Sequence, residues 1–266
     1  MNCTLIICTY NWPEALNLVL SSVVKQSIMP NEIIIADDGS TQSTAKVLEK
    51  LSSQISVPVI HSWQEDLGCR ISHSRNRAIA KSNFEYIIMI DGDTVLHQDF
   101  IKDHINFAKQ GVYLQGSRAL LQEKFTKNVF KENLFIKPSY FSSHTKNKLN
   151  LIRLPYISLL ISFFKNKNIN RIRGCNFSIY KQDILKVNGF NEEMITWGRE
   201  DSEFVQRLFN SGIYKQHLKF SGIQYHLFHN ERVLNSQDSA NANNIFLENT
   251  VNKNLVRCKF GIDRYL

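Results

Sequence analysis

Two aspartates one residue apart follow an apolar run in the segment YIIMIDGDTV, where they are Asp91 and Asp93. Short carboxylates on a turn supply the hard oxygen ligands that Mg²⁺ and Mn²⁺ prefer, and such an ion usually keeps open positions for phosphate oxygens. Asp-Gly is also a common turn dipeptide where a strand meets water. The pair therefore predicts either a divalent-cation site or a simple strand-to-loop turn.

A second acidic pair, Glu200 and Asp201, stands in the segment WGREDSEF. Apolar residues at helical spacing follow it, which places both carboxylates in the first turn of an amphipathic helix. The helix dipole stabilises negative charge there, so one interpretation is purely structural. The other is catalytic, with a carboxylate that takes the proton of an attacking hydroxyl group. The residues alone leave both interpretations open.

Three further residues could line a sugar-binding surface. The ring of Trp197 offers a flat apolar face on which a sugar can stack, although it could equally pack in the core. Gly198 would give backbone clearance beside the acidic pair. Asn176 follows Gly174 at the start of another predicted strand, where the two would let the backbone approach a sugar closely.

Two histidines three residues apart, His226 and His229, follow an apolar run that predicts a strand. Imidazole could complete a metal site. On a strand the two rings would point to opposite faces, so both can meet one ion only if the chain turns there. A capping or core role for either ring stays open.

The elements that would hold these residues alternate over the first hundred residues. Strand-like apolar runs occupy residues 3–9, 32–37, 56–60 and 85–91, and helical patterns open at Pro13, at Ser43 or Thr44, and at residue 72. Strict alternation of strand and helix predicts an α/β fold, with a mostly parallel, Rossmann-like central sheet flanked by helices.

Polar residues recur where the predicted strands end, and ligands bind beyond the carboxyl ends of strands in such sheets. They are Thr9, Tyr10, Asp37, Asp38, Asp66, Asp91 and Asp93. Loop polarity explains each one singly but explains poorly why acidic residues recur at one edge. The chain has no Gly-x-Gly-x-x-Gly or Gly-Lys-Ser/Thr loop, so a metal ion and Arg70, Arg75 or Arg77 would have to neutralise bound phosphates.

The charge of the chain points to an anionic partner. Its 266 residues carry 32 Lys and Arg against 24 Asp and Glu, and much of the excess lies between Lys124 and Arg173. Within that stretch, residues 154–164 form an uncharged apolar run that is too short to span a bilayer. The run predicts either a core helix or an interfacial segment whose basic flanks meet anionic lipid.

The five cysteines are scattered without a Cys-x-x-Cys pair, which suggests reduced thiols, and the first residues lack a signal-peptide pattern. We therefore expect a cytoplasmic protein, with peripheral contact to the inner face of the cytoplasmic membrane through residues 150–170.

Several segments in order resemble the nucleotide-sugar-dependent glycosyltransferases of the GT-A fold, in particular family 2. They are IICTYNWPEAL, EIIIADDGS, WQEDLGCRISHSRNRAIAKS and YIIMIDGDTVLHQDFI, the last of which resembles the family's Asp-x-Asp motif. The segment from Gly174 to Gly212 resembles the acceptor and catalytic segment of galactosyl- and N-acetylgalactosaminyltransferases.

The resemblance implies donor-binding roles. Thr9, Asp38 and Asp66 match positions that hold the uridine or ribose, and Arg75 matches one near the base or diphosphate. The predicted donor-binding residues are Thr9, Tyr10, Asp38, Asp66, Arg70, Arg75 and Asp91.

The resemblance also implies a Mn²⁺ or Mg²⁺ cofactor. Asp93 matches the direct metal ligand, while Asp91 matches a residue that more often contacts ribose or a metal-bound water. His226 fits the related His-x-Phe pattern better than His229 does.

For catalysis the resemblance favours Asp201 as general base and Glu200 as a ligand of acceptor hydroxyls. Trp197, Gly198 and Asn176 complete the predicted acceptor site.

The implied activity is inverting, metal-dependent transfer of a sugar from a UDP-hexose or UDP-N-acetylhexosamine to a glycan or lipid-linked glycan, in the synthesis of bacterial lipopolysaccharide or capsule. We expect one domain, with a donor-binding half (1–117), a variable basic and apolar insertion (118–170) and an acceptor-binding half (171–266). The Asn- and Ser-rich residues 235–255 predict a mobile tail or lid.

Two other classes of protein fit part of the sequence. A nucleotidyltransferase also uses paired aspartates and a metal, but it would carry a Gly-rich basic loop after the first strand. A basic, non-catalytic nucleic-acid-binding protein would explain the charge. It would leave the acidic strand ends unexplained, so we expect no nucleic-acid partner.

Overall fold

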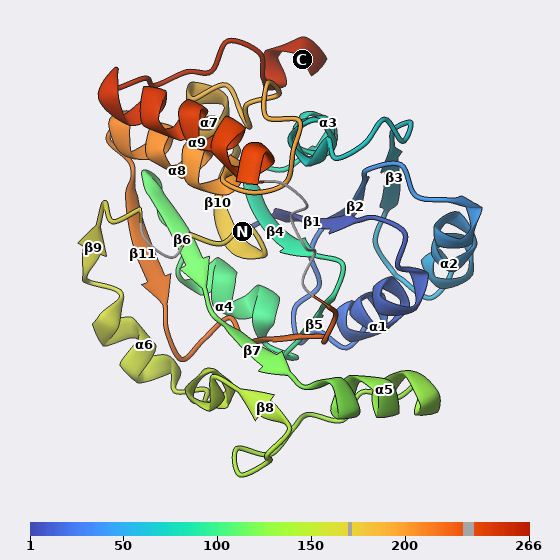
Figure 1. Ribbon diagram of the computed structural model, residues 1–266. Helices are drawn as coiled ribbons and strands as arrows, with labels where there is room; N and C mark the ends of the chain where they lie inside the picture. The colour runs from blue at the N-terminus through green and yellow to red at the C-terminus, as the bar shows by residue number, and fades with distance from the viewer. Residues whose placement is uncertain (170–171, 231–236) are drawn as a thin grey trace.

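Four parallel strands from the first hundred residues form one half of the central sheet in the computed structural model, which describes residues 1–169, 172–230 and 237–266 (Figure 1). They are β1 (Cys3–Thr9), β2 (Glu32–Asp37), β3 (Val59–Trp63) and β4 (Tyr86–Asp91). Thr9 lies opposite Asp37, which lies opposite Trp63, and Cys8 lies opposite Asp91. The strands therefore end at one edge of the sheet.

Helices cover both faces of these strands. α1 (Pro13–Val23) and α2 (Gln42–Ser52) pack on the face that carries Leu5 and Ile7 of β1, and α3 (Ile71–Lys81) packs on the face that carries Ile6 and Cys8. Because successive side chains of a strand alternate between faces, a continuously apolar strand is what a sheet buried on both sides requires. The predicted α/β fold with a mostly parallel sheet is confirmed.

The remaining strands of the eight-stranded sheet come from later in the chain, and the full order is β3-β2-β1-β4-β10-β6-β11-β9. They are β6 (Val112–Gly116), β9 (Lys165–Asn166), β10 (Asn176–Tyr180) and β11 (Tyr214–Leu218). The helices among them are α4 (Phe100–Asn106), α7 (Lys181–Lys186), α8 (Glu200–Asn210) and α9 (Gln237–Asn252), and a 3₁₀ turn, η2 (Ile262–Tyr265), lies near the end of the chain. The predicted halves thus share one sheet.

A second, four-stranded sheet joins distant parts of the chain in the order β5-β12-β7-β8. Its strands are β5 (Thr94–Leu96), β7 (Arg118–Leu121), β8 (Thr145–Lys146) and β12 (Gln224–His226). The predicted insertion contributes two of them, together with α5 (Glu123–Glu132), η1 (Lys148–Leu151) and α6 (Pro155–Ile161). This small sheet brings residue 226 beside residue 94.

Three local predictions were wrong. The third strand lies three residues later than residues 56–60, and α2 begins at Gln42, before either residue expected to cap it. Residues 237–252 form helix α9, which packs on α8, so most of the predicted tail or lid is a helix; residues 235–236 lie outside the described residues.

The core-helix interpretation of residues 154–164 was also wrong. Ser158 is the buried residue of α6, while Tyr156 and Leu160 are exposed. Across the described ranges, no helix combines the length and the apolarity that crossing a bilayer requires.

Candidate active site

Thr9 and Asp38 meet where β1 and β2 end. The Asp38 amide donates to the Thr9 carbonyl oxygen at 3.1 Å. The Asp38 carboxylate accepts hydrogen bonds from the Gln64 side chain at 2.6 Å and from the Arg70 amide at 3.0 Å. Burial raises the pKa of this carboxyl group above its usual value. Gln64, to which the sequence analysis gave no role, therefore orients the predicted uridine-binding carboxylate.

Tyr10 and Asp66 lie in exposed loops at the same edge of the sheet. The exposed Tyr10 hydroxyl donates to Asp66 Oδ2 at 2.9 Å, and the Gly68 amide donates to Asp66 Oδ1 at 3.2 Å. The Arg70 side chain donates to the Glu65 carbonyl oxygen at 2.6 Å, so its charge faces this loop. The predicted base-binding residues thus lie on neighbouring loops.

Asp91 and Asp93 flank a glycine that has no room for a side chain. A Cβ atom on Gly92 would lie 2.9 Å from the Cys8 carbonyl oxygen, which accepts the Gly92 amide at 2.7 Å. Asp91 Oδ1 is buried, lies 3.9 Å from Arg75 Nη2 and accepts no hydrogen bond from any described residue. Burial and the charge of Asp93 raise the pKa of Asp91 to about 7.

Asp93, His226 and His229 converge on one point. His226 Nε2 and His229 Nε2 lie 3.5 and 3.3 Å from Asp93 Oδ2, and the three ligand atoms lie within 4.8 Å of one another. β12 ends at His226, and the chain then turns, so the imidazoles are not held on opposite faces of a strand. The Leu227 amide donates to the Asp93 carbonyl oxygen at 2.9 Å and fixes this approach.

The chemistry of this cluster fits a divalent metal ion. Asp93 Oδ1 is buried and accepts no hydrogen bond from the described residues, so a ligand position remains open. Burial raises the pKa of Asp93, but the hydrogen bond from His229 and the charges of both histidines outweigh it and lower the pKa. Burial lowers the pKa of His226, which favours the neutral imidazole that binds metal. Asp91 lies outside this three-residue cluster.

Arg118 supplies a cation that the sequence analysis missed. It begins β7 and contributes positive charge at Asp91 and Asp93. Its position depends on the pairing of β7 with β12, and no local motif signals that pairing. Arg77, one of the expected phosphate partners, instead lies near Lys81 and Tyr265.

Arg75 joins the metal-side carboxylates to the acidic pair of α8. Its guanidinium group is 2% exposed, and Nη1 donates to Glu200 Oε1 at 3.2 Å. Glu200 Oε2 accepts the Gly198 amide at 3.0 Å. Glu200 is itself buried, so its carboxylate is engaged by the protein.

Asp201 occupies the second position of α8, beside Gly174. Its Oδ1 accepts the Ser202 amide at 2.6 Å and its Oδ2 accepts the Gly174 amide at 2.9 Å. Burial and the charge of Glu200 raise the pKa of Asp201 to about 6, although Arg75 and the two amides act in the opposite direction. A carboxylate that titrates near 6 can take up a proton and release it near neutral pH.

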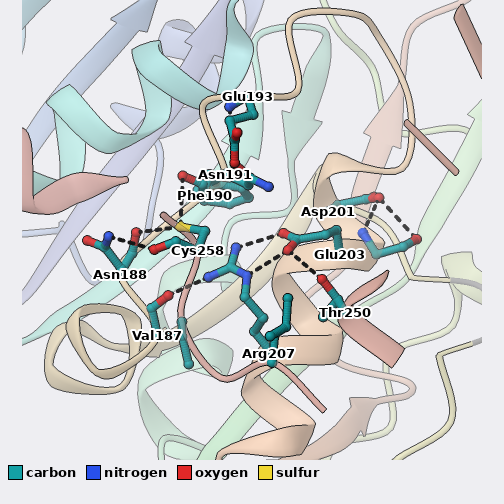
Figure 2. Close-up of polar contacts among 12 residues, drawn as sticks. Val187, Asn188, Phe190, Asn191, Glu193, Asp201, Glu203, Arg207, Thr250 and Cys258 are labelled. Carbon is teal, nitrogen blue, oxygen red and sulfur yellow. Dashed lines mark hydrogen bonds and ion pairs between the residues drawn. The ribbon is translucent and has the colours of Figure 1, made fainter. Parts of the chain in front are cut away.

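The interior face of α8 fixes its orientation (Figure 2). Arg207 donates to both oxygens of Glu203 at 2.8 Å, and both side chains are almost fully inaccessible. The Thr250 hydroxyl of α9 donates to Glu203 Oε1 at 3.0 Å, and Arg207 also donates to the Val187 carbonyl oxygen. This network holds the turn that presents Asp201.

The predicted acceptor residues fall into two groups. Trp197 is 45% exposed, and its loop is held by Asn243, whose amide donates to the Thr196 and Gly198 carbonyl oxygens. Gly198 has φ +103°, and a Cβ atom there would meet nothing within 4 Å. Glycine is therefore favoured by its backbone angle, and its predicted place beside the acceptor stays a prediction.

Asn176 is a structural residue, and its predicted contact with the acceptor was wrong. It is 1% exposed, and its amide nitrogen donates to the Ser117 and Gly222 carbonyl oxygens at 2.9 and 3.1 Å. Its Oδ1 lies 3.1 Å from His104 Nε2. Both ends of the amide are thus occupied inside the protein.

Comparison with known proteins assigns the chain to a family. The model described as glycosyl transferase family 2 matches residues 4–186, and that of the N-terminal domain of galactosyltransferase matches residues 158–230. The chain is 26% identical over 237 residues to a chondroitin synthase of Pasteurella multocida, covering 84% of this chain and 24% of that protein. A cholesterol galactosyltransferase of Borreliella burgdorferi is 32% identical over 211 residues, covering 77% of this chain and 54% of that protein.

The chain thus spans about a quarter and about half of these two relatives. Among solved structures, residues 1–349 of TarS from Staphylococcus aureus in complex with UDP-GlcNAc match with a TM-score of 0.66 at 17% identity, covering all of this chain and 69% of that one. That likeness concerns the fold. Because the family model covers more than half of the sequence, the protein belongs to glycosyl transferase family 2, and its fold is the GT-A fold.

Proposed function

We propose that the protein transfers one sugar from a UDP-sugar, a UDP-hexose or UDP-N-acetylhexosamine, to a glycan acceptor with inversion at the anomeric carbon. The observation that carries the proposal is the convergence of Asp93, His226 and His229, with Arg75 linking neighbouring Asp91 to the acidic pair of α8. The UDP-GlcNAc named with TarS and the sugar transfer named for the relatives support a nucleotide-sugar donor.

The same three residues would hold Mn²⁺ or Mg²⁺, and Asp91 would contact the ribose or a water on the ion. A divalent cation at this position neutralises charge on the diphosphate as the sugar departs. Arg118, which adds positive charge beside both aspartates, would contact the diphosphate from the protein side. Asp38 and Asp66 would hold the uridine.

Asp201 would act as general base. The acceptor oxygen forms a bond to the anomeric carbon, its proton passes to the Asp201 carboxylate, and the bond from the anomeric carbon to the diphosphate breaks, releasing UDP. The Gly174 and Ser202 amides orient the carboxylate, and Arg75 and Glu200 set its distance from the donor side. The exposed Trp197 ring would support the acceptor sugar.

The acceptor we propose is a glycan or lipid-linked glycan of a bacterial surface polysaccharide, lipopolysaccharide or capsule. The chondroitin synthase relative is named for making a polysaccharide, which supports this assignment. We also propose that residues 150–170 contact a membrane surface on which such an acceptor is carried.

A thermal-shift experiment tests the donor site. The wild type should be stabilised by UDP in the presence of Mn²⁺, and at a hundredfold excess over Kd binding adds about 2.7 kcal/mol to the free energy of unfolding. Asp93→Ala and the double variant His226→Ala/His229→Ala should lose the Mn²⁺-dependent part. Asp263→Ala, an exposed carboxylate near the end of the chain, is the control and should behave as wild type. An equal UDP response in all four proteins would falsify the assignment.

A further inference from the structure

Residues 134–164 carry a concentration of exposed apolar side chains, which we call the docking face. In the described part of the chain 26 large hydrophobic residues are exposed, and 12 of them lie in these 31 positions. Phe141 is 88% exposed, Tyr156 86%, Phe163 75% and Phe164 77%. Isolated exposed apolar residues are normal, but a contiguous set of this kind marks a surface that meets a partner or a membrane.

The docking face is held rigidly from behind by polar contacts. The Leu154 amide donates to the Phe220 carbonyl oxygen at 2.9 Å. The Arg153 guanidinium donates to both oxygens of Asp103 at 3.1 and 2.6 Å, and it lies 3.3 Å from Asp99. These contacts fix α6 without using its apolar side chains. Figure 1 places β8 and α6 along one edge of the molecule, opposite α9 and the C-terminus.

The segment that forms the docking face carries only positively charged side chains. Residues 133–182 contain nine Lys and Arg and no Asp or Glu. The other 216 residues hold 23 basic and 24 acidic residues, so the positive charge of the protein comes from this segment. Aromatic side chains flanked by cations are what an anionic lipid interface attracts.

A hollow of about 680 Å³ lies between the docking face and the sheet. Leu149 and Ile161 line one side, and its cationic lining residues are Lys148, Arg173 and Lys219, with the imidazole of His217 beside them. None of the described lining residues is acidic. Burial, with smaller contributions from the charges of Lys215, Lys219 and Arg173, lowers the pKa of His217, so this imidazole lines the hollow in its neutral form. Phosphate is the group whose charge and oxygen acceptors such a lining would bind.

We propose that the docking face binds the surface of a bilayer containing anionic phospholipid, with its aromatic side chains among the headgroups and the cations of the hollow on lipid phosphates. Arg173 precedes Gly174, whose amide holds Asp201. Docking would therefore present a lipid-linked acceptor beside the general base. That consequence rests on the proposed sugar transfer, whereas the docking is argued from this surface and its charge alone.

Vesicle co-sedimentation of the full chain tests the proposal. Wild type should bind vesicles of phosphatidylcholine with about one-third phosphatidylglycerol, and should not bind phosphatidylcholine alone. Binding should weaken in 1 M NaCl, where the Debye length falls to about 3 Å. Phe163→Ser/Phe164→Ser should lower the affinity at least about tenfold. Lys146→Ala/Lys148→Ala should lower it about thirtyfold, since each cation near an anionic surface contributes about a factor of five.

Two matched controls carry the same changes elsewhere. Ile28→Ser/Phe260→Ser alters two exposed apolar residues outside the docking face, and Lys46→Ala/Lys50→Ala alters two exposed lysines on α2. Both should bind vesicles as wild type does. A thermal unfolding midpoint and a far-UV circular dichroism spectrum equal to those of the wild type show that each variant is folded.

Equal vesicle binding by the wild type and both docking-face variants would overturn the proposal. So would a wild-type dimer that dissociates on Phe163→Ser/Phe164→Ser without any vesicle binding, because the face would then join two copies of the chain. Vesicle binding without a UDP response would reject the proposed donor site and leave the docking in place.

Discussion

Arg75 and Arg207 are both buried, and they differ in how fully the protein satisfies them. Arg207, 0% exposed, gives two hydrogen bonds of 2.8 Å to Glu203 and a third to a carbonyl oxygen. Arg75, 2% exposed, gives one bond of 3.2 Å to a carboxylate, that of Glu200, and lies 3.9 Å from Asp91. It also contacts the Cys8 thiol and the face of the Phe190 ring. Its Nε has no hydrogen-bond partner among the described residues.

The difference in hydrogen bonding suits two roles. Arg207 belongs to a structural ion pair, whereas Arg75 lies in the site that we propose binds a ligand. A buried charge is tolerated when its partner and hydrogen bonds compensate for desolvation, as around Arg207. Around Arg75 the buried oxygens of Asp91 and Asp93 are incompletely paired, which is the expected arrangement where a substrate and an ion supply the missing contacts. Helix α8 connects the two environments, with Glu200 at one and Glu203 at the other.

The largest effect on activity should come from substitution of Asp201, the proposed general base near Arg75. Asp201→Asn should lower kcat about a hundredfold to ten-thousandfold, because the amide cannot accept the proton of the acceptor hydroxyl. UDP-dependent stabilisation should be unchanged. Turnover close to wild type, measured as UDP release from a UDP-sugar, would remove Asp201 from the mechanism.

Substitution of Arg207 should instead lower the free energy of unfolding. Arg207→Met leaves Glu203 buried without its partner and should lower the free energy of unfolding by about 3–5 kcal/mol, measured by urea titration. The double variant Glu203→Leu/Arg207→Met should recover much of that loss, because an apolar pair carries no desolvation cost. If the double variant is as unstable as the single one, the pair is not the source of the effect.

Arg75→Met should lower activity more than it lowers folding stability, the opposite of what we expect for Arg207→Met. Loss of a hydrogen bond to a charged group corresponds to about 1.5–3 kcal/mol, which predicts a tenfold to hundredfold loss in kcat/KM. The loss of folding stability should be smaller than for Arg207→Met, since the protein satisfies Arg75 less completely. Urea titration and initial rates, measured on the same preparation of each variant, give the stability loss and the activity loss. If Arg75→Met lost more stability than Arg207→Met, the role of Arg75 would be structural.

The pH profile sharpens the functional side of the comparison. A general base works only when ionised, and the pKa of Asp201 is raised from 3.8 to about 6. At saturating donor, kcat should be maximal above about pH 7 and fall about tenfold per unit below pH 6. UDP affinity measured across the same range separates this titration from that of Asp91. A flat kcat down to pH 5 would contradict the assignment.

The smallest effect should follow removal of the third hydrogen bond to the Glu203 carboxylate. Thr250→Val deletes a hydroxyl that donates to Glu203 at 3.0 Å, and about 1 kcal/mol of stability should be lost because Arg207 still satisfies the carboxylate. Thr250→Ser keeps the hydroxyl and serves as the control. Any change in UDP affinity would mean that the two sides of α8 are more closely coupled than the geometry suggests.

Local sequence patterns predicted the donor half of the fold because its strands are buried on both faces and its helices carry one apolar face. The family and the fold class are confirmed, and the predicted positions Asp38, Asp91 and Asp93 lie at one edge of the sheet. Alternating strands and helices predict parallel strands, and the carboxyl ends of parallel strands meet at one edge of the sheet. That shared edge brings these side chains together.

The errors arose where position depends on contacts distant in sequence. Asn176 has the polarity of a ligand-binding residue, but it serves three backbone and side-chain partners in the core. Arg118 acquires its place through β12, more than 100 residues later. For the apolar run at 154–164 a core helix and an interfacial segment both stayed open, because composition alone cannot show that the run lies on the surface.

The pairing of β5 with β12 also has a consequence for how the protein is made. Asp93 emerges from the ribosome about 130 residues before His226 and His229, and the small sheet forms only when β12 is available. A nascent chain that has folded its donor half therefore carries the carboxylates but neither imidazole. Under the proposed metal assignment, ion binding would begin only in chains that have joined both halves, so incomplete products would remain inactive towards nucleotide sugars.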